Sequence, residues 1–449
     1  MKTINENITF KRKLYDKLLV WKEKWSNEYA LLIEGARRIG KSTLVEEFAK
    51  KEYKSYILID FQKVNKEILD IFETSSADLD TFFFRLQAQR EIKLIKGKSL
   101  IIFDEVQLYP KARQMIKTLV QDGRYHYIET GSLISLKENI ENILIPSEEM
   151  KLKMYPLSFE EFCWATNKTL LFDYIRTCFE KKIEMGRAMH TTAMEHFRKY
   201  LIIGGMPQAI KKYLITNTYA DVNTVKNEIL NLYREDINKS KKVNSLKIKA
   251  IFDNIPSELS KHDKKFKFSH LNRGSRTKLY DNELYWLGES MIANLAYKSS
   301  EPSISLKMNL DSSTVKCYLV DTGLLLTQSL LLENNKEGFE KLLMGKLNIN
   351  EGMFFENIVA QLLINNYPLF FYTTINESRH KIENDFLIND KGKISLIEVK
   401  SSSTNSHKSL DYTYEKFKKH LSKKIIIGIK DYKFFSNVYY YPVYMTELL

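Results

Sequence analysis

The sequence predicts an α/β protein with several domains, on three observations. Short apolar segments alternate with helical segments in the first third of the chain, as in a parallel sheet covered by helices. Residues 155–245 are mainly helical in pattern, which fits a linking or lid region, and residues 246–345 have the outline of a winged helix. Residues 346–449 again alternate helix and strand. At 449 residues, the chain also exceeds the usual size of one hydrophobic core.

The first domain is expected over residues 1–154, around a parallel sheet. Residues 29–36 form the first apolar strand, and a loop bounded by glycines leads from it into a helical pattern. Helical segments such as Asp80–Leu94 separate the strands that follow. These further strands are Tyr56–Asp60, Ser99–Asp104 and His126–Thr130.

The loop after the first strand matches the phosphate-binding pattern G-x-x-x-x-G-K-[ST], and it lies between a strand and a helix as that pattern requires. Its glycines let the backbone curl so that N–H groups point at phosphate oxygens, and the following helix adds its positive dipole end. Lys41 is expected to bridge the β- and γ-phosphates, so ATP is the expected ligand. The expected nucleotide-binding residues are Gly35, Ala36, Arg37, Arg38, Ile39, Gly40, Lys41, Ser42 and Thr43.

Two carboxylates, Asp104 and Glu105, lie at the end of the apolar strand that begins at Ser99. Parallel sheets bind ligands at this carboxyl end of their strands. The Ser42 hydroxyl and the Asp104 carboxylate are expected to hold Mg²⁺, Asp104 through the water shell of the ion. Glu105 is placed to polarise the water that attacks the γ-phosphorus, as a general base does. The sequence therefore predicts Mg²⁺ as a second cofactor and hydrolysis of ATP as the reaction.

The rest of the hydrolytic site is expected from the next strand and from an arginine. That strand ends in the segment ETGS, in which Ser132 is the expected sensor of the γ-phosphate. Hydrolysis in this class commonly needs an arginine that neutralises charge on the transferred phosphoryl group. Arg113 and Arg124 are the candidates, with Arg124 assigned to the site, and Arg37 or Arg38 is the local alternative.

A second group of charged residues lies within residues 346–449. Asp385 is on one expected strand, and Glu398 and Lys400 share a face of the next strand, because alternate residues of a strand point the same way. Glu356 can join them from the preceding helix. Carboxylates beside a lysine can hold hard cations and activate water for phosphodiester cleavage. An exposed ion pair between Glu398 and Lys400 is the alternative interpretation.

Composition narrows the expected partners. The chain has 69 Lys and Arg against 56 Asp and Glu, a net charge of +13, which favours an anionic partner such as DNA, with a solvated basic surface as the alternative. Three widely separated cysteines argue against a disulfide framework and a zinc cluster. Neither a secretion signal nor a long apolar run is found, so we expect no membrane contact and a cytoplasmic protein.

Nine segments spread along the chain match a known family, and they are GARRIGKST, LIIFDEVQ, ETGS, YPLSFEEF, YREDI, YLVDTGLL, FFENIVA, NDFLI and IEVKSS. They resemble a family of prokaryotic AAA-type P-loop ATPases that carry a restriction-endonuclease-like C-terminal domain of undefined function. The likeness covers nearly the full length of the chain. It implies an ATPase, a winged-helix-like middle region and a C-terminal PD-(D/E)xK-type fold. One departure is Asn384, where a hydrophobic residue is usual before the aspartate.

Three functions follow from these observations. The first is a Mg²⁺-dependent ATPase coupled to DNA binding through the basic middle and C-terminal regions. The second is a nucleotide-dependent switch that recruits a protein partner, and it predicts that DNA leaves hydrolysis unchanged. The third is a metal-dependent nuclease gated by ATP. Assembly of several copies into a homo-oligomer is compatible with each, since the sequence does not fix the oligomeric state.

Overall fold

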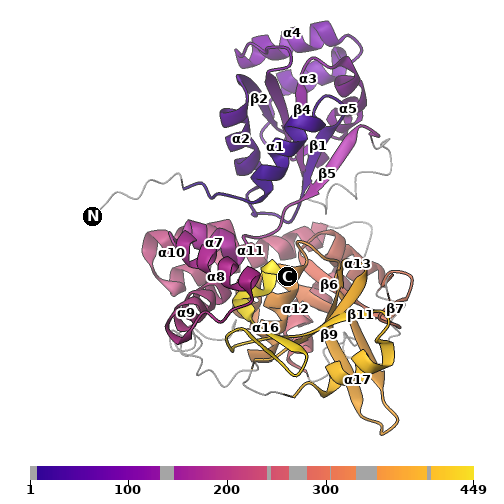
Figure 1. Cartoon of the computed structure of the whole chain (residues 1–449). Helices are drawn as coiled ribbons and strands as arrows, with labels where there is room; N and C mark the ends of the chain where they lie inside the picture. The colour runs from indigo at the N-terminus through magenta and orange to yellow at the C-terminus, as the bar shows by residue number, and fades with distance from the viewer. Residues whose placement is uncertain are drawn as a thin grey trace.

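The computed structural model describes residues 8–131, 146–239, 244–261, 281–303, 305–329, 351–401 and 406–449. Figure 1 shows two bodies of unequal size. The smaller body, in indigo and purple at the top, contains the first five strands, and the larger body below contains the remaining helices and strands. The chain passes from one to the other between β5 and α7, near residues 154–158.

The smaller body is built on a five-stranded sheet of order β2-β3-β4-β1-β5. All its strand pairs are parallel, as the sequence predicts. The edge strand β5 is not predicted, because its sequence EMKLK has only two apolar residues. The strands are β1 (Ala30–Glu34), β2 (Ser55–Asp60), β3 (Ser99–Asp104), β4 (His126–Gly131) and β5 (Glu149–Lys153).

Helices cover both faces of this sheet because successive side chains of its apolar strands point to opposite sides. Leu31 and Ile33 of β1 belong to the core shared with α1 and α2, whereas Ala30 and Leu32 belong to the core shared with α3, α4 and α5. The helices are α1 (Leu14–Lys24), α2 (Lys41–Glu52), α3 (Lys66–Thr74), α4 (Leu79–Arg90), the 3₁₀ turn η1 (Val106–Leu108) and α5 (Pro110–Asp122).

The larger body begins with a set of helices that replaces the alternating pattern, as the sequence predicts for residues 155–245. Their apolar side chains join one continuous core that also includes residues of α1, α2 and β1. No helix of the described residues is long and apolar enough to cross a bilayer. The helices are α7 (Phe159–Ala165), α8 (Thr169–Lys181), α9 (Arg187–Ile203), α10 (Pro207–Thr216), α11 (Tyr219–Lys239), α12 (Ser245–Ser260), α13 (Asp281–Glu289) and α14 (Thr322–Ser329).

Two strands of the middle region, β6 (Ala293–Ser299) and β7 (Leu310–Leu319), pair with each other and extend the C-terminal sheet, because β6 also pairs with β8. The sheet has eight strands in the order β12-β13-β11-β10-β9-β8-β6-β7. The expected division between residues 345 and 346 therefore crosses one continuous sheet. The winged helix stays a prediction, and residues 262–280 of that region lie outside the described residues.

Beyond residue 350, the elements follow the predicted order of helix, three strands, helix and strand. Strands β8, β9 and β10 form an antiparallel meander, and β11 adds parallel to β10. The restriction-endonuclease-like identity of this region stays a prediction. The elements are α16 (Glu351–Leu363), β8 (Phe370–Ile375), β9 (Lys381–Asp390), β10 (Lys393–Val399), α17 (Lys408–Phe417), β11 (Leu421–Gly428), β12 (Lys433–Phe435), β13 (Val438–Pro442) and η5 (Val443–Leu448).

Candidate nucleotide-binding site

The loop between β1 and α2 depends on two glycines for different reasons. A Cβ atom at Gly35 would lie 2.5 Å from the Met154 carbonyl oxygen and 2.3 Å from the Ile39 side chain, so this position has no room for one. At Gly40 a Cβ would meet Pro207 at an ordinary 3.6 Å, but φ is +92°, a conformation that side chains disfavour. The first glycine therefore provides space and the second provides backbone freedom.

Lys41 lies inside this loop. Its ammonium donates hydrogen bonds to the carbonyl oxygens of Gly35 and Ala36, both at 2.9 Å. Burial lowers the pKa of Lys41 to about 8, although the nearby carboxylates of Glu105 and Asp104 oppose that shift. The predicted phosphate-binding lysine is thus held at the centre of the loop by two neutral carbonyls, which an anionic ligand can replace.

The side chain of Asp104 joins the ends of β3, β4 and α2. The Ser42 hydroxyl donates to Asp104 Oδ1 at 2.8 Å, and the Thr130 hydroxyl donates to the same oxygen. Burial raises the pKa of Asp104, and these two hydrogen bonds act in the opposite direction. The predicted magnesium ligands are therefore adjacent. Ser132 lies outside the described residues, so its predicted sensor role stays a prediction, and Thr130 is the described hydroxyl of that segment.

Glu105 lies directly beyond β3, in a left-handed backbone conformation with φ of 54°. Its N–H donates to Thr130 Oγ1 at 3.4 Å, and its carboxylate accepts a hydrogen bond from the Gln107 amide. Asp60 ends the neighbouring strand opposite Asp104. Several carboxylates therefore meet at the sheet edge beside Lys41, with Glu105 held by its side-chain amide neighbour.

The two candidate arginines are engaged elsewhere. Arg113 is buried and forms a two-pronged ion pair with Glu149, with distances of 2.9 and 2.8 Å. Arg124 pairs with Asp122 and Asp80. It precedes the first residue of β4, whereas the phosphate loop follows the last residue of the parallel strand β1. Within one chain Arg124 therefore lies at the opposite end of the parallel strands from Lys41, and its assignment to the hydrolytic site stays a prediction.

Helix α11 of the larger body contacts the phosphate loop through the segment YREDI. The Tyr233 hydroxyl donates to the Arg37 carbonyl oxygen at 3.1 Å, and Arg37 Nη1 lies 3.0 Å from Asp236 Oδ1. Burial raises the pKa of Asp236, an effect that the Arg37 guanidinium opposes. Sequence analysis assigns Arg37 to the nucleotide alone and misses this contact, although YREDI is among the segments that resemble the family.

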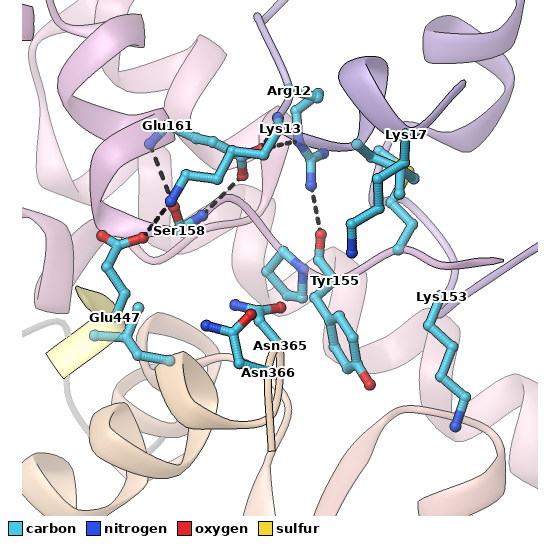
Figure 2. A pocket seen from close by; sticks show the side chains of 14 residues that line it. Arg12, Lys13, Lys17, Lys153, Tyr155, Ser158, Glu161, Asn365, Asn366 and Glu447 are labelled. Atoms are coloured by element: carbon cyan, nitrogen blue, oxygen red, sulfur yellow. Dashed lines mark hydrogen bonds and ion pairs between the residues drawn. The ribbon is translucent and has the colours of Figure 1, made fainter. Parts of the chain in front are cut away.

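Arg12 makes a second connection between the two bodies. Its guanidinium donates to the Ile39 carbonyl oxygen in the phosphate loop at 2.9 Å and to the Tyr155 carbonyl oxygen at 2.6 Å. It also lies 3.1 Å from Glu161 of α7. Figure 2 shows Arg12 between the N-terminal segment and the chain around Tyr155. One buried cation thus fixes the loop to the beginning of the larger body.

Two cavities lie beside these contacts. The cavity in Figure 2, of about 170 Å³, is lined by the N-terminal segment, residues 153–158 and the end of α16, with Lys17 and Lys153 among its side chains. The other, of about 180 Å³, adjoins the phosphate loop at Gly40 and Thr43, and Pro207 of α10 also lines it. The second cavity is the one that shares residues with the predicted phosphate site.

Comparison with known families identifies the smaller body. Residues 27–163 match the family model of an AAA domain. This part of the chain is an AAA-type P-loop domain. Residues 194–336 and 351–445 match the models of two different domains of unknown function. A comparison with curated proteins gave no match.

A comparison with solved structures found two ATPases with low similarity to this chain. A Walker-type ATPase of Pyrococcus abyssi is 15% identical over 72% of this chain and 96% of its own, with a TM-score of 0.43. A signal-transduction ATPase of Pyrococcus horikoshii with a tetratricopeptide repeat sensor is 11% identical over 80% of this chain and 50% of its own, with a TM-score of 0.29.

Outside the AAA domain, the predicted C-terminal site includes a lysine from β7. Glu356 and Asp385 both lie near Lys316 of β7, at 3.0 and 3.5 Å from its Nζ. Glu398 pairs with Lys400, just beyond the end of β10. The N–H of Val399, the residue between them, donates a hydrogen bond to Asp385. The structure therefore adds Lys316 to the predicted cluster, and the roles of its four predicted residues stay a prediction.

Lys316 and Glu383 are the members of this cluster that sequence analysis misses. Glu383 Oε1 lies 2.7 Å from Lys316 Nζ. Burial alone would lower the pKa of Lys316, but Glu356, Tyr318, Glu383 and Asp385 together raise it well above its usual value. A signal for Glu383 exists, since it is two residues before Asp385 and shares its strand face. Lys316 stands between apolar residues in the segment TVKCYL, but its partners cannot be read from that position.

Proposed function

We propose that the chain binds ATP with Mg²⁺ in its AAA domain and hydrolyses it. The observation that carries this proposal is the hydrogen bond between the Ser42 hydroxyl and the Asp104 carboxylate beside Lys41. Glu105 follows Asp104 directly in the chain. A hydroxyl and a carboxylate are hard oxygen ligands of the kind that magnesium sites use. The residues present therefore fit the ion as well as the nucleotide.

Each residue has a separate role in this proposal. Lys41 exchanges the carbonyls of Gly35 and Ala36 for β- and γ-phosphate oxygens. Ser42 and Asp104 would hold Mg²⁺, and the bound ion would neutralise phosphate charge. Glu105 accepts a proton from the attacking water. The adenosine half extends into the cavity beside Gly40 and Thr43, against Pro207.

We further propose that hydrolysis is coupled to DNA. The net charge of +13 supports an anionic partner. Arg273, Arg276 and Lys278 are basic residues of the middle region suited to bind phosphates, and they lie outside the described residues. Assembly of several copies into a homo-oligomer stays a prediction of the sequence.

The deciding measurement is the ATPase rate with and without double-stranded DNA over a range of salt concentrations. We expect hydrolysis that requires Mg²⁺ and that DNA accelerates at least severalfold, with the acceleration lost as salt displaces the DNA. Hydrolysis that is unchanged by DNA, at a salt concentration where binding is measured directly, contradicts the coupling. Failure to bind ATP at all contradicts the proposal as a whole.

A second candidate function is a nucleotide-dependent switch, and the contacts of α11 favour it. Asp236 and Tyr233 touch Arg37, which belongs to the phosphate loop itself. Arg12 ties the same loop to α7 through Glu161. A rearrangement of the loop on nucleotide binding therefore acts on the larger body through direct bonds. The partner in this function is a protein that recognises one arrangement of that body.

If the chain is such a switch, the variant Asp236→Ala should still bind ATP but should lose the structural response of α11 to ATP. Because the variant removes the Arg37 ion pair but none of the expected phosphate ligands, we expect ATP affinity to change less than about tenfold. The ATP-dependent change in amide hydrogen exchange of α11 should be lost. Arg234→Ala is the matched control, since Arg234 lies on the same helix and pairs with Asp253. An equal loss of response in the control would contradict a specific role for Asp236.

A further inference from the structure

The C-terminal module consists of residues 351–449 together with β6 and β7. Three of its carboxylates converge on Lys316. The Lys316 side chain has no exposed surface. Its Nζ lies 3.0 Å from Glu356 on α16, and 2.7 and 3.5 Å from Glu383 and Asp385 on β9. An ammonium has three protons to donate, and three carboxylates surround it. The Phe371 ring lies beneath the same Nζ, 5.0 Å from its centroid.

These residues do not fit the metal that a PD-(D/E)xK-type site implies. A hard divalent cation needs oxygen ligands that face one common point at about 2.0–2.6 Å. In this cluster the common point is taken by Lys316 Nζ, at hydrogen-bond distances. Among the residues that the structure describes, no group of three or more His, Cys, Asp or Glu side chains is arranged to hold an ion.

The other two residues of the predicted site are also engaged. Glu398 pairs with Lys400. The second carboxylate oxygen of Asp385 accepts a hydrogen bond from the Val399 N–H at 2.8 Å. Asp385 therefore joins β9 to β10 and faces Lys316 at the same time. One oxygen of Glu398 pairs with Lys400, whereas the other, Oε2, is buried without a hydrogen-bond partner among the described residues. The pattern that suggests a nuclease is present in the sequence, but in the fold the point on which Glu356, Glu383 and Asp385 converge holds the Lys316 ammonium.

We propose that the Lys316 ammonium occupies the position of a catalytic cation, so that the C-terminal module works without a metal and does not cleave phosphodiesters by metal-dependent chemistry. The lysine serves instead as a built-in cation that ties β7, α16 and β9 together. Tyr318, two residues further along β7, supports this arrangement because its hydroxyl donates a hydrogen bond to Glu356. The module then acts as an interaction unit attached to the AAA domain.

This proposal predicts that removing the lysine creates a site for a divalent cation. In Lys316→Ala, three carboxylates lose their common positive partner in a largely buried place, so their repulsion destabilises the fold. We expect the melting temperature of the full chain in a chelator to fall by on the order of 5–10 °C. Millimolar Mn²⁺, a hard cation that suits carboxylates, should restore at least half of that loss while leaving the wild-type chain unchanged.

Lys298→Ala is the matched control, because Lys298 pairs with Asp311 on the neighbouring strand and remains partly exposed. We expect a small loss of stability there and no response to Mn²⁺. A second measurement does not depend on the folding of Lys316→Ala: electron paramagnetic resonance of Mn²⁺ with the nucleotide-free full chain and with Asp385→Asn. Equal binding by both supports the proposal. Weaker binding by Asp385→Asn, or no rescue of Lys316→Ala by Mn²⁺, overturns it.

Discussion

Replacing Glu105 by glutamine should stop ATP hydrolysis while preserving ATP binding. The amide keeps the shape of the side chain but cannot accept the proton of the attacking water, and general base catalysis contributes about 10²–10⁴-fold. We therefore expect kcat to fall by about that factor in Glu105→Gln. The nucleotide affinity, measured by calorimetry with Mg²⁺ present, should change only a few-fold, because Lys41, Ser42 and Asp104 remain in place.

Asp60→Asn is the matched control for this substitution. Asp60 ends β2 at the same edge of the sheet, opposite Asp104, and accepts a hydrogen bond from the Gln62 N–H. Removing the negative charge of Asp60 should leave most of the ATP hydrolysis rate. Equal losses in both variants would show that the general charge of the sheet edge matters more than the position of Glu105. A Glu105→Gln enzyme with the normal rate would exclude Glu105 as the base.

Replacing Lys41 by alanine should weaken nucleotide binding itself rather than slow only the chemical step of hydrolysis. Hydrogen bonds to charged groups contribute about 1.5–3 kcal/mol each, and Lys41 is expected to make two of them to phosphate oxygens. The affinity for ATP in Lys41→Ala should therefore fall by about 10²–10⁴-fold. The protein should stay folded, because Lys41 donates only to two loop carbonyls before the nucleotide binds.

Lys50→Ala provides the comparison, since Lys50 lies on the same helix, is exposed and pairs with Glu46. Calorimetric titration with ATP and Mg²⁺ should give an unchanged affinity for this variant. A thermal melt without nucleotide separates lost binding from lost folding in Lys41→Ala. If Lys41→Ala bound ATP as tightly as Lys50→Ala does, the loop would not be the phosphate site.

The proposal for Lys316 alters the balance among the three functions. If the C-terminal module holds no metal, ATP binding cannot gate a metal-dependent cleavage within the same chain. The remaining functions both use the module as a surface, for DNA in one case and for a protein in the other. They differ in whether DNA changes the hydrolysis rate, and the contacts of Asp236 and Arg12 with the phosphate loop are available to either.

The sequence by itself determined the AAA domain and the centre of its site. A phosphate loop is a local structure, because Gly35, Lys41 and Ser42 lie within one strand-loop-helix unit. Asp104 and Glu105 could be added because parallel strands bring their carboxyl ends to one edge of a sheet. The order of elements beyond residue 350 was also readable, since each has its own hydrophobic period.

Only the tertiary structure decided which charges meet. Tyr233 reaches the phosphate loop across 196 residues, and Lys316 meets Glu356 across 40. The same holds for Arg124, whose residue type fits an arginine finger but which precedes β4 and pairs with Asp122 and Asp80. An ion pair depends on distance in space, and the packing of helices on sheets sets that distance. A local hydrophobic period or a short motif therefore cannot predict which charged residues form ion pairs.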